Sequence, residues 1–131
     1  MPVPTLSEQL RELALANRIA ANEGVVDTFG HVSMRHPDNP KRYFLSRSSA
    51  PNMVRAEGLI EYDLDSQPVR DPGVPQYSER VIHGEIYKAR PDVMSVCHHH
   101  SPGSRTGWES RSYSIKPSAL TMLGALERDR K

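Results

Sequence analysis

The chain lacks several features that would place it in a broad class of proteins. It has one cysteine, Cys97, so a disulfide within the chain is excluded. No stretch approaches the roughly 18 consecutive apolar residues that cross a bilayer, and the N-terminus has no signal-peptide pattern. The net charge is only +1, which gives no general attraction to nucleic acid or to an anionic membrane. We therefore expect a cytoplasmic protein that binds neither nucleic acid nor membrane.

What is present fits one small domain with a lean core, because 131 residues with 37% hydrophobic content suffice for a single apolar centre. Thr5 and Glu8 form a capping-box pattern, and apolar residues follow at helical spacing until Gly24, a typical residue just past a helix end. Alternating residues predict strands over 29–35, 42–46 and 59–64, the first two as a hairpin.

The second half predicts one further helix and one further strand. Ser78 is expected to cap a helix from Glu79 to about Arg90, with an inward face formed by Ile82, Ile86 and Ala89. A strand over 93–100 follows, so the chain is predicted to be α/β. Residues 103–131 differ in character: they are rich in Ser and Arg, offer only a weak apolar stripe (Leu120, Leu123 and Leu126), and supply no evident partner strand for 93–100.

Residues 98–100 are three consecutive histidines, and imidazole is the commonest protein ligand for zinc and similar metals. On a strand, His98 and His100 share one face, about 6.5–7 Å apart along the chain, and can converge on one ion. Cys97 then faces the other way and is expected to be a buried small residue. An exposed strand end that merely scavenges metal is the alternative. Two histidines do not complete a site, because catalytic zinc usually has three protein ligands and structural zinc four.

Several stretches together, in order and spacing, resemble the class II aldolase/adducin family. They are Phe29–Arg35, the loop Leu45–Pro51, the segment from Tyr77 to Asp92, and Val96–Pro102. The resemblance covers residues 13–102, about two-thirds of the chain. It implies a three-layer α/β/α fold with a central, mainly antiparallel sheet, here incomplete. It also suggests residues 1–102 as the N-terminal part of this domain and 103–131 as a diverged tail.

The resemblance implies roles for particular residues. His98 and His100 match metal ligands, with zinc expected and manganese or iron as alternatives. Glu79 matches the general acid/base; by itself it would be an ordinary carboxylate at a helix N-terminus, favoured by the helix dipole. His83, one turn later, is expected only to orient Glu79. The implied substrate contacts are Gly30, His31, Ser48, Ser49, Tyr77 and Ser78, although Ser48 and Ser49 equally suit a simple polar turn.

Departures from the sugar-phosphate members point to a different substrate. His31, Ser49 and Tyr77 stand where those enzymes carry Asn, Gly and Ser, and the added bulk disfavours a backbone cradle for phosphate. These departures resemble the non-sugar branch of the family, which includes metal-dependent decarboxylases. The resemblance therefore implies a metal-dependent carbon–carbon lyase, a decarboxylase of a ring-derived or hydroxy acid rather than a sugar-phosphate aldolase. A non-catalytic remnant or interaction module of the same family is the alternative.

The choice between these two functions depends on residues 103–131. The resemblance implies a third metal histidine and a tyrosine proton donor beyond residue 102, and a homo-oligomer, commonly a tetramer, acting on a small molecule. No histidine occurs after His100. We therefore expect that the three-histidine site is not completed within one copy, and that 103–131 is a replaced, truncated or misread end. A transcript that continues after Pro102 with an apolar strand and a later histidine would support this, whereas a verified message for 103–131 would exclude a misread gene.

Overall fold

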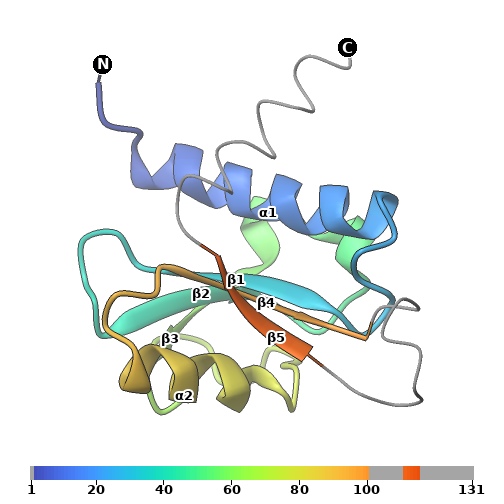
Figure 1. Cartoon of the computed structure of the whole chain (residues 1–131). Coiled ribbons are helices and arrows are strands. Elements are labelled where there is room, and N and C mark those ends of the chain that lie inside the picture. The colour runs from blue at the N-terminus through green and yellow to red at the C-terminus, as the bar shows by residue number, and fades with distance from the viewer. Residues whose placement is uncertain (1, 101–110, 116–131) are drawn as a thin grey trace.

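The computed structural model describes residues 2–100 and the backbone of residues 111–115. Two helices, α1 (Leu6–Asn22) and α2 (Arg80–Ala89), accompany five strands, namely β1 (His31–Arg35), β2 (Arg42–Ser46), β3 (Leu59–Asp63), β4 (Ser95–His99) and β5 (Arg111–Ile115). The strands form one antiparallel sheet in the order β3-β2-β1-β4-β5. Helix α1 covers one face and α2 the other (Figure 1), which confirms the predicted three-layer α/β/α fold.

Helix α1 begins and ends where the sequence indicates. The Thr5 hydroxyl accepts a hydrogen bond from the Glu8 N–H at 3.2 Å, and the Glu8 carboxylate accepts one from the Thr5 N–H at 2.7 Å. Gly24 follows the helix with a φ of 71°, a left-handed conformation that glycine adopts without strain. The apolar face packs on the sheet, in a cluster that contains Leu13, Ala20, Val26, Val32, Met34, Phe44 and Cys97.

Asn17 is a fully buried polar residue in the middle of this apolar face. Its Oδ1 accepts a hydrogen bond from the Val32 N–H at 2.9 Å, and its Nδ2 donates to the Val32 carbonyl at 3.1 Å. Strand β1 pairs with β2 at Met34 and Arg35, so the Asn17 amide hydrogen-bonds to the β1 backbone just before that pairing begins. Because a buried backbone group without a partner costs about 1–3 kcal/mol, Asn17 fixes α1 against the start of β1.

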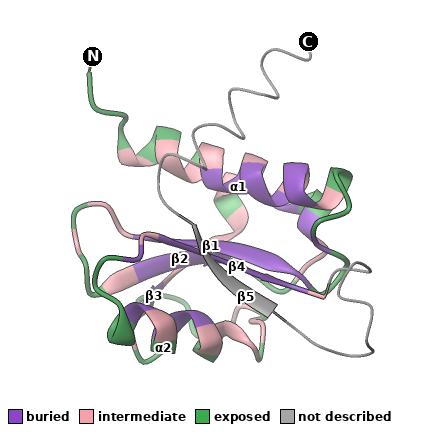
Figure 2. Ribbon diagram, viewed as in Figure 1, coloured by how far each residue is buried: buried purple, intermediate pink, exposed green. Residues whose placement is uncertain are grey.

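Helix α2 covers the second apolar cluster, which contains Tyr43, Leu45, Tyr62, Tyr87, Val93 and Val96. The predicted inward face is wrong by about one position: His83, Gly84 and Tyr87 are buried, whereas Ala89 is exposed (Figure 2). The cause is the close approach at Gly84, where a Cβ would lie 2.4 Å from Ser66 Oγ. The helix can sit this close to the turn after β3 only with glycine inward, and this orientation turns His83 toward the sheet.

Arg35 joins the ends of β1 and α2 through a buried guanidinium. Its Nη2 donates to the carbonyls of Tyr87 at 2.8 Å and Arg90 at 3.0 Å, and its Nε donates to the Val93 carbonyl at 2.9 Å. A cation near the C-terminal carbonyls of a helix is also favoured by the helix dipole. Arg35 therefore sets the position of α2 relative to β1, the two elements that carry His83 and His31.

The tail contains a strand that the sequence did not reveal. Strand β5 pairs with β4 over five residues, from Ser95 opposite Ile115 to His99 opposite Arg111, so the expectation that the tail supplies no partner strand for 93–100 is wrong. The weak stripe of Leu120, Leu123 and Leu126 lies outside the described residues, and so does the segment 101–110 around the predicted domain division, which stays a prediction. Within the described chain, neither helix combines the length and the apolar character needed to traverse a bilayer.

Candidate metal centre

Glu79 stands at the N-terminal end of α2 and turns away from the helix. It is the N-cap residue, the place predicted for Ser78, yet its side chain makes no capping hydrogen bond. Instead its Oε2 lies 2.5 Å from His98 Nε2 and 3.8 Å from His100 Nε2. The His98 side chain is 1% exposed, whereas that of Glu79 is 36% exposed. The carboxylate therefore joins a buried imidazole to solvent, an arrangement that the helix dipole alone does not explain.

His98 and His100 converge as the strand alternation predicts. Their Nε2 atoms are 3.1 Å apart and their ring centroids 5.0 Å apart. Ligands held about 2.1 Å from a tetrahedral zinc ion are separated by about 3.4 Å, so this spacing is close to that of two ligands of one ion. Cys97 lies on the opposite face of β4 in the α1 cluster, and burial raises the pKa of its thiol to about 11, as expected of an inert core residue.

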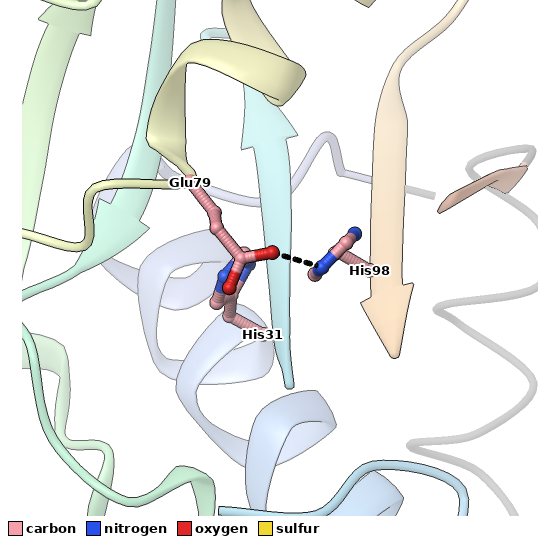
Figure 3. A group of neighbouring side chains, drawn as sticks. All are labelled: His31, Glu79 and His98. Carbon is pink, nitrogen blue, oxygen red and sulfur yellow. Dashed lines mark ion pairs between the residues drawn. The ribbon is translucent and has the colours of Figure 1, made fainter. Parts of the chain in front are cut away.

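A third imidazole, His31 of β1, lies beside these groups. Strand pairing places His31 opposite His98, and the two rings stack with centroids 5.1 Å apart. Ligand atoms of His31, Glu79 and His98 all lie within 4.8 Å of one another (Figure 3). Burial, with the neighbouring His98 and His100, lowers the pKa of His31 to about 3, so its ring is neutral. Neutral imidazoles with one carboxylate are a donor set that suits zinc and similar divalent cations.

His83 contacts His31 rather than Glu79, contrary to the orienting role expected for it. Its Nε2 is 2.8 Å from His31 Nδ1, and its Nδ1 is 2.5 Å from Ser33 Oγ. Ser33 Oγ is in turn 2.7 Å from the Tyr87 hydroxyl. Burial lowers the pKa of His83 and raises the pKa of Tyr87, so both side chains stay neutral. A buried hydrogen-bonded chain therefore runs from His31 into the core. The sequence spacing could have indicated these contacts, because Ser33 shares a strand face with His31 and Tyr87 follows His83 by one helical turn.

Beside this cluster is a cavity of about 380 Å³ that reaches Glu79. Its lining includes most of the expected substrate contacts, namely Ser48, Ser49, Tyr77 and Ser78, together with Phe29. The volume lies within the usual range of small-molecule sites. A larger hollow of about 830 Å³ lies between the end of α1 and the loop at 50–52, but Glu79 and the three clustered histidines do not line it. The smaller cavity is therefore the better candidate for a substrate pocket.

The loop that would cradle a phosphate is closed by internal hydrogen bonds. The Tyr77 hydroxyl donates to the Ser49 carbonyl and accepts from the Ser49 N–H at 3.3 Å, while the Ser48 N–H donates to the Pro75 carbonyl at 2.9 Å. Gly30 has a packing reason to be glycine, since a Cβ there would lie 2.5 Å from Val26 Cβ and 3.2 Å from the His98 carbonyl. Two backbone donors that could hold an oxyanion are therefore engaged within the protein.

Comparison with known proteins agrees with this architecture. Residues 11–120 match the family model described as the Class II Aldolase and Adducin N-terminal domain. Decarboxylase tropJ of Talaromyces stipitatus is 40% identical over 79 residues, 59% of this chain and 30% of that protein. The 3,4-dihydroxyphthalate decarboxylase of Arthrobacter keyseri is 31% identical over 100 residues, 69% of this chain and 39% of that protein.

Among solved structures, L-fuculose 1-phosphate aldolase from Glaciozyma antarctica PI12 matches with a TM-score of 0.65 and 29% identity. The match covers 77% of this chain and 45% of that one, so the chain spans less than half the length of each of these three proteins. Other relatives are named as a methylthioribulose-1-phosphate dehydratase and a probable ribulose-phosphate epimerase. The chain therefore shares its fold with proteins that are named for several different reactions.

Proposed function

The chain belongs to the class II aldolase and adducin family, and from that premise we propose that it forms the core of a divalent-metal-dependent carbon–carbon lyase. The observation that carries the proposal is the convergence of Glu79, His98 and His100 at the edge of a cavity large enough for a small substrate. Zinc is the proposed metal because imidazole and carboxylate are its usual ligands, with manganese and iron as alternatives.

The proposed roles follow from the position of each side chain. His98 and His100 hold the cation, which when bound would polarise a substrate oxygen next to the scissile bond and stabilise negative charge there. Glu79 is half exposed on the cavity side, and we assign it the transfer of a proton to the carbon from which the leaving group departs. Loss of carbon dioxide and retro-aldol cleavage both need this proton, so the roles of the three residues do not depend on which bond breaks.

The substrate we propose is a ring-derived or hydroxy acid that loses carbon dioxide. Support comes from the Tyr77–Ser49 hydrogen bonds, which occupy a donor that a phosphate would need. Phe29 is 65% exposed and lines the cavity, so it offers an aromatic face to a ring. Two relatives are named as decarboxylases, one of them the 40% identical protein. A homo-oligomer remains part of the proposal, by analogy with the family.

The test combines metal content with turnover in the full 131-residue chain. We expect about one zinc per chain, release of carbon dioxide from at least one aromatic hydroxy acid, and no cleavage of fuculose 1-phosphate. Glu79→Gln is expected to lower turnover by at least about 100-fold while metal remains bound, because general acid–base catalysis contributes about that much. His98→Ala should lose the metal, and His36→Ala, on the remote β1–β2 turn, is the matched control.

Each outcome has a distinct meaning. Unchanged turnover in Glu79→Gln would remove Glu79 from the mechanism, and cleavage of fuculose 1-phosphate in place of decarboxylation would overturn the substrate class. A folded wild-type chain that takes up no metal would favour the alternative, a non-catalytic interaction module of the same family.

A further inference from the structure

His31 has one ring nitrogen engaged in the core and one that faces the candidate metal centre. Its Nδ1 is 2.8 Å from His83 Nε2. Its Nε2 is buried and finds no hydrogen-bond partner among the described residues, although the whole side chain is 0% exposed. A buried polar atom normally has a partner, because leaving it without one costs about 1–3 kcal/mol. This nitrogen is therefore available to bind a ligand.

We infer that His31 Nε2 is a third imidazole ligand of the metal, and that His83 holds the proton of His31 on Nδ1. The inference rests on the metal site proposed above and deepens it. It assigns to β1 the ligand that we expected only from a later part of the sequence. His31 then binds the metal, and His83 acts as a positioning residue behind it.

The location of the other histidines singles out His31. No histidine follows His100 in the sequence. His99 alternates with His98 along β4 and so faces the other layer, and His36 pairs with Glu61 at 3.6 Å beyond the far end of β1. His83 has both nitrogens within hydrogen-bond distance of His31 and Ser33. Of the six histidines, His31 alone combines a buried, unpartnered nitrogen with a place beside His98 and Glu79.

The chain of contacts behind His31 can supply the required tautomer. If Nε2 is the ligand, Nδ1–H of His31 donates to His83 Nε2, and Nδ1–H of His83 donates to Ser33 Oγ. The Ser33 hydroxyl then donates to Tyr87, so each donor in the chain points away from the metal. Metal-binding histidines usually donate their second ring N–H to such a partner, which fixes the ring and increases its basicity. Every group in the chain finds a partner in this arrangement.

The distances permit it with a small adjustment. Ligand atoms of His31, Glu79 and His98 fall within 4.8 Å of one another, whereas ligands of a tetrahedral zinc ion are about 3.4 Å apart. The contraction required is at most about 1.4 Å, and side-chain rotations supply it because β1 and β4 are directly paired at this point. The result is a site within the described part of the chain in which three imidazoles, His31, His98 and His100, would hold the cation, while Glu79 lies beside it on the cavity side for proton transfer.

The experiment measures zinc affinity of the full chain by competition with a chromophoric chelator. We expect His31→Asn, whose amide is too short to reach the cation, to weaken zinc binding by more than about 100-fold, comparable with His98→Ala. His83→Gln, which removes only the partner behind the ligand, should weaken it by about 10–100-fold. His36→Ala is the matched histidine control and should bind as the wild type does.

Cobalt replacing zinc adds a readout of coordination. The visible absorption of the cobalt form should lose intensity in His31→Asn and keep it in His36→Ala. Nitrogen-15 NMR of the zinc-loaded wild type, which needs no variant, should find the His31 proton on Nδ1. That measurement keeps the inference testable if His31→Asn does not fold.

Two results would overturn the inference. The first is wild-type zinc affinity in a folded His31→Asn while His98→Ala has lost the metal; the metal site of the proposed function would then stand without His31. The second is a His31 proton on Nε2 in the zinc form, which would make His31 a donor to substrate. Zinc binding unaffected in both His98→Ala and His31→Asn would instead refute the proposed metal site itself.

Discussion

At the scale of single residues, the Tyr77 hydroxyl decides which ligand the neighbouring loop can accept. It donates to the Ser49 carbonyl and accepts from the Ser49 N–H, so one side chain satisfies both backbone groups of that residue. The ring also lies 4.4 Å from the His31 ring between centroids, which places it between the loop and the metal centre. Tyr77 therefore engages the Ser49 N–H, a backbone donor that an anion at this loop would otherwise use.

Tyr77→Phe tests this role. The change leaves the Ser49 N–H without a partner, so we expect the free energy of unfolding to fall by about 1 kcal/mol, and inorganic phosphate to stabilise the variant but not the wild type. Urea unfolding with and without phosphate measures both effects. Tyr62→Phe is the control, because the Tyr62 hydroxyl has no hydrogen-bond partner among the described residues and Tyr62 lies outside the cavity lining. An unchanged response to phosphate in Tyr77→Phe would show that this hydroxyl does not exclude anions.

At the scale of elements, the position of α2 depends on Gly84. A Cβ there would lie 2.4 Å from Ser66 Oγ and 2.8 Å from the Leu64 carbonyl. Alanine favours a helix over glycine by about 1 kcal/mol, but overpacking against backbone costs about 1–3 kcal/mol and displaces the element. We expect Gly84→Ala to destabilise the fold by about 1–2 kcal/mol in thermal unfolding. It should also weaken metal binding, because α2 carries Glu79 at its start and His83 in its first turns.

Gly58→Ala is the control for that substitution. A Cβ at Gly58 would meet only the flexible Arg47 side chain at 3.4 Å, an ordinary contact. Its stability should therefore stay within about 0.5 kcal/mol of the wild type. A Gly84→Ala variant that is more stable than the wild type would mean that helix propensity outweighs the close approach.

The same elements show how far sequence alone could go. Helix α1 and the β1–β2 hairpin were predicted because capping residues, Gly24 and strand alternation are local signals. Strand β5 was missed because its polar, alternating residues form a strand by pairing with β4, a partner that local sequence does not reveal. The inward face of α2 was misjudged because periodicity counts apolar residues, whereas His83 and Gly84 face inward.

The site was predictable to a different extent. His98 and His100 follow from alternation within one strand, and Glu79 from the family resemblance. The place of His31 beside His98 depends on the register between β1 and β4, two strands far apart in the sequence, and no local pattern fixes that register. The hydrogen bonds that link His31, His83, Ser33 and Tyr87 could not be predicted for the same reason, because they join side chains of β1 and α2.

At the scale of the whole molecule, a bound cation would join the second helical layer to two central strands. Glu79 belongs to the start of α2, His98 lies within β4 and His100 just beyond its end, and His31 belongs to β1. These groups converge only in the folded chain, so a metal that binds them stabilises the native state by mass action. Stability of the whole fold thus reports on the site without any knowledge of the substrate.

We expect free zinc at about 100 times its dissociation constant to add about 2.7 kcal/mol to the free energy of unfolding and to raise the melting temperature by roughly 10 °C. Differential scanning calorimetry with and without a chelator measures this shift. His98→Ala should abolish the shift, whereas His36→Ala should retain it, because His36 pairs with Glu61 away from the site. A shift of equal size in His98→Ala would mean that zinc stabilises the fold through another site. If zinc does not change the melting temperature of the wild type, no metal links these layers.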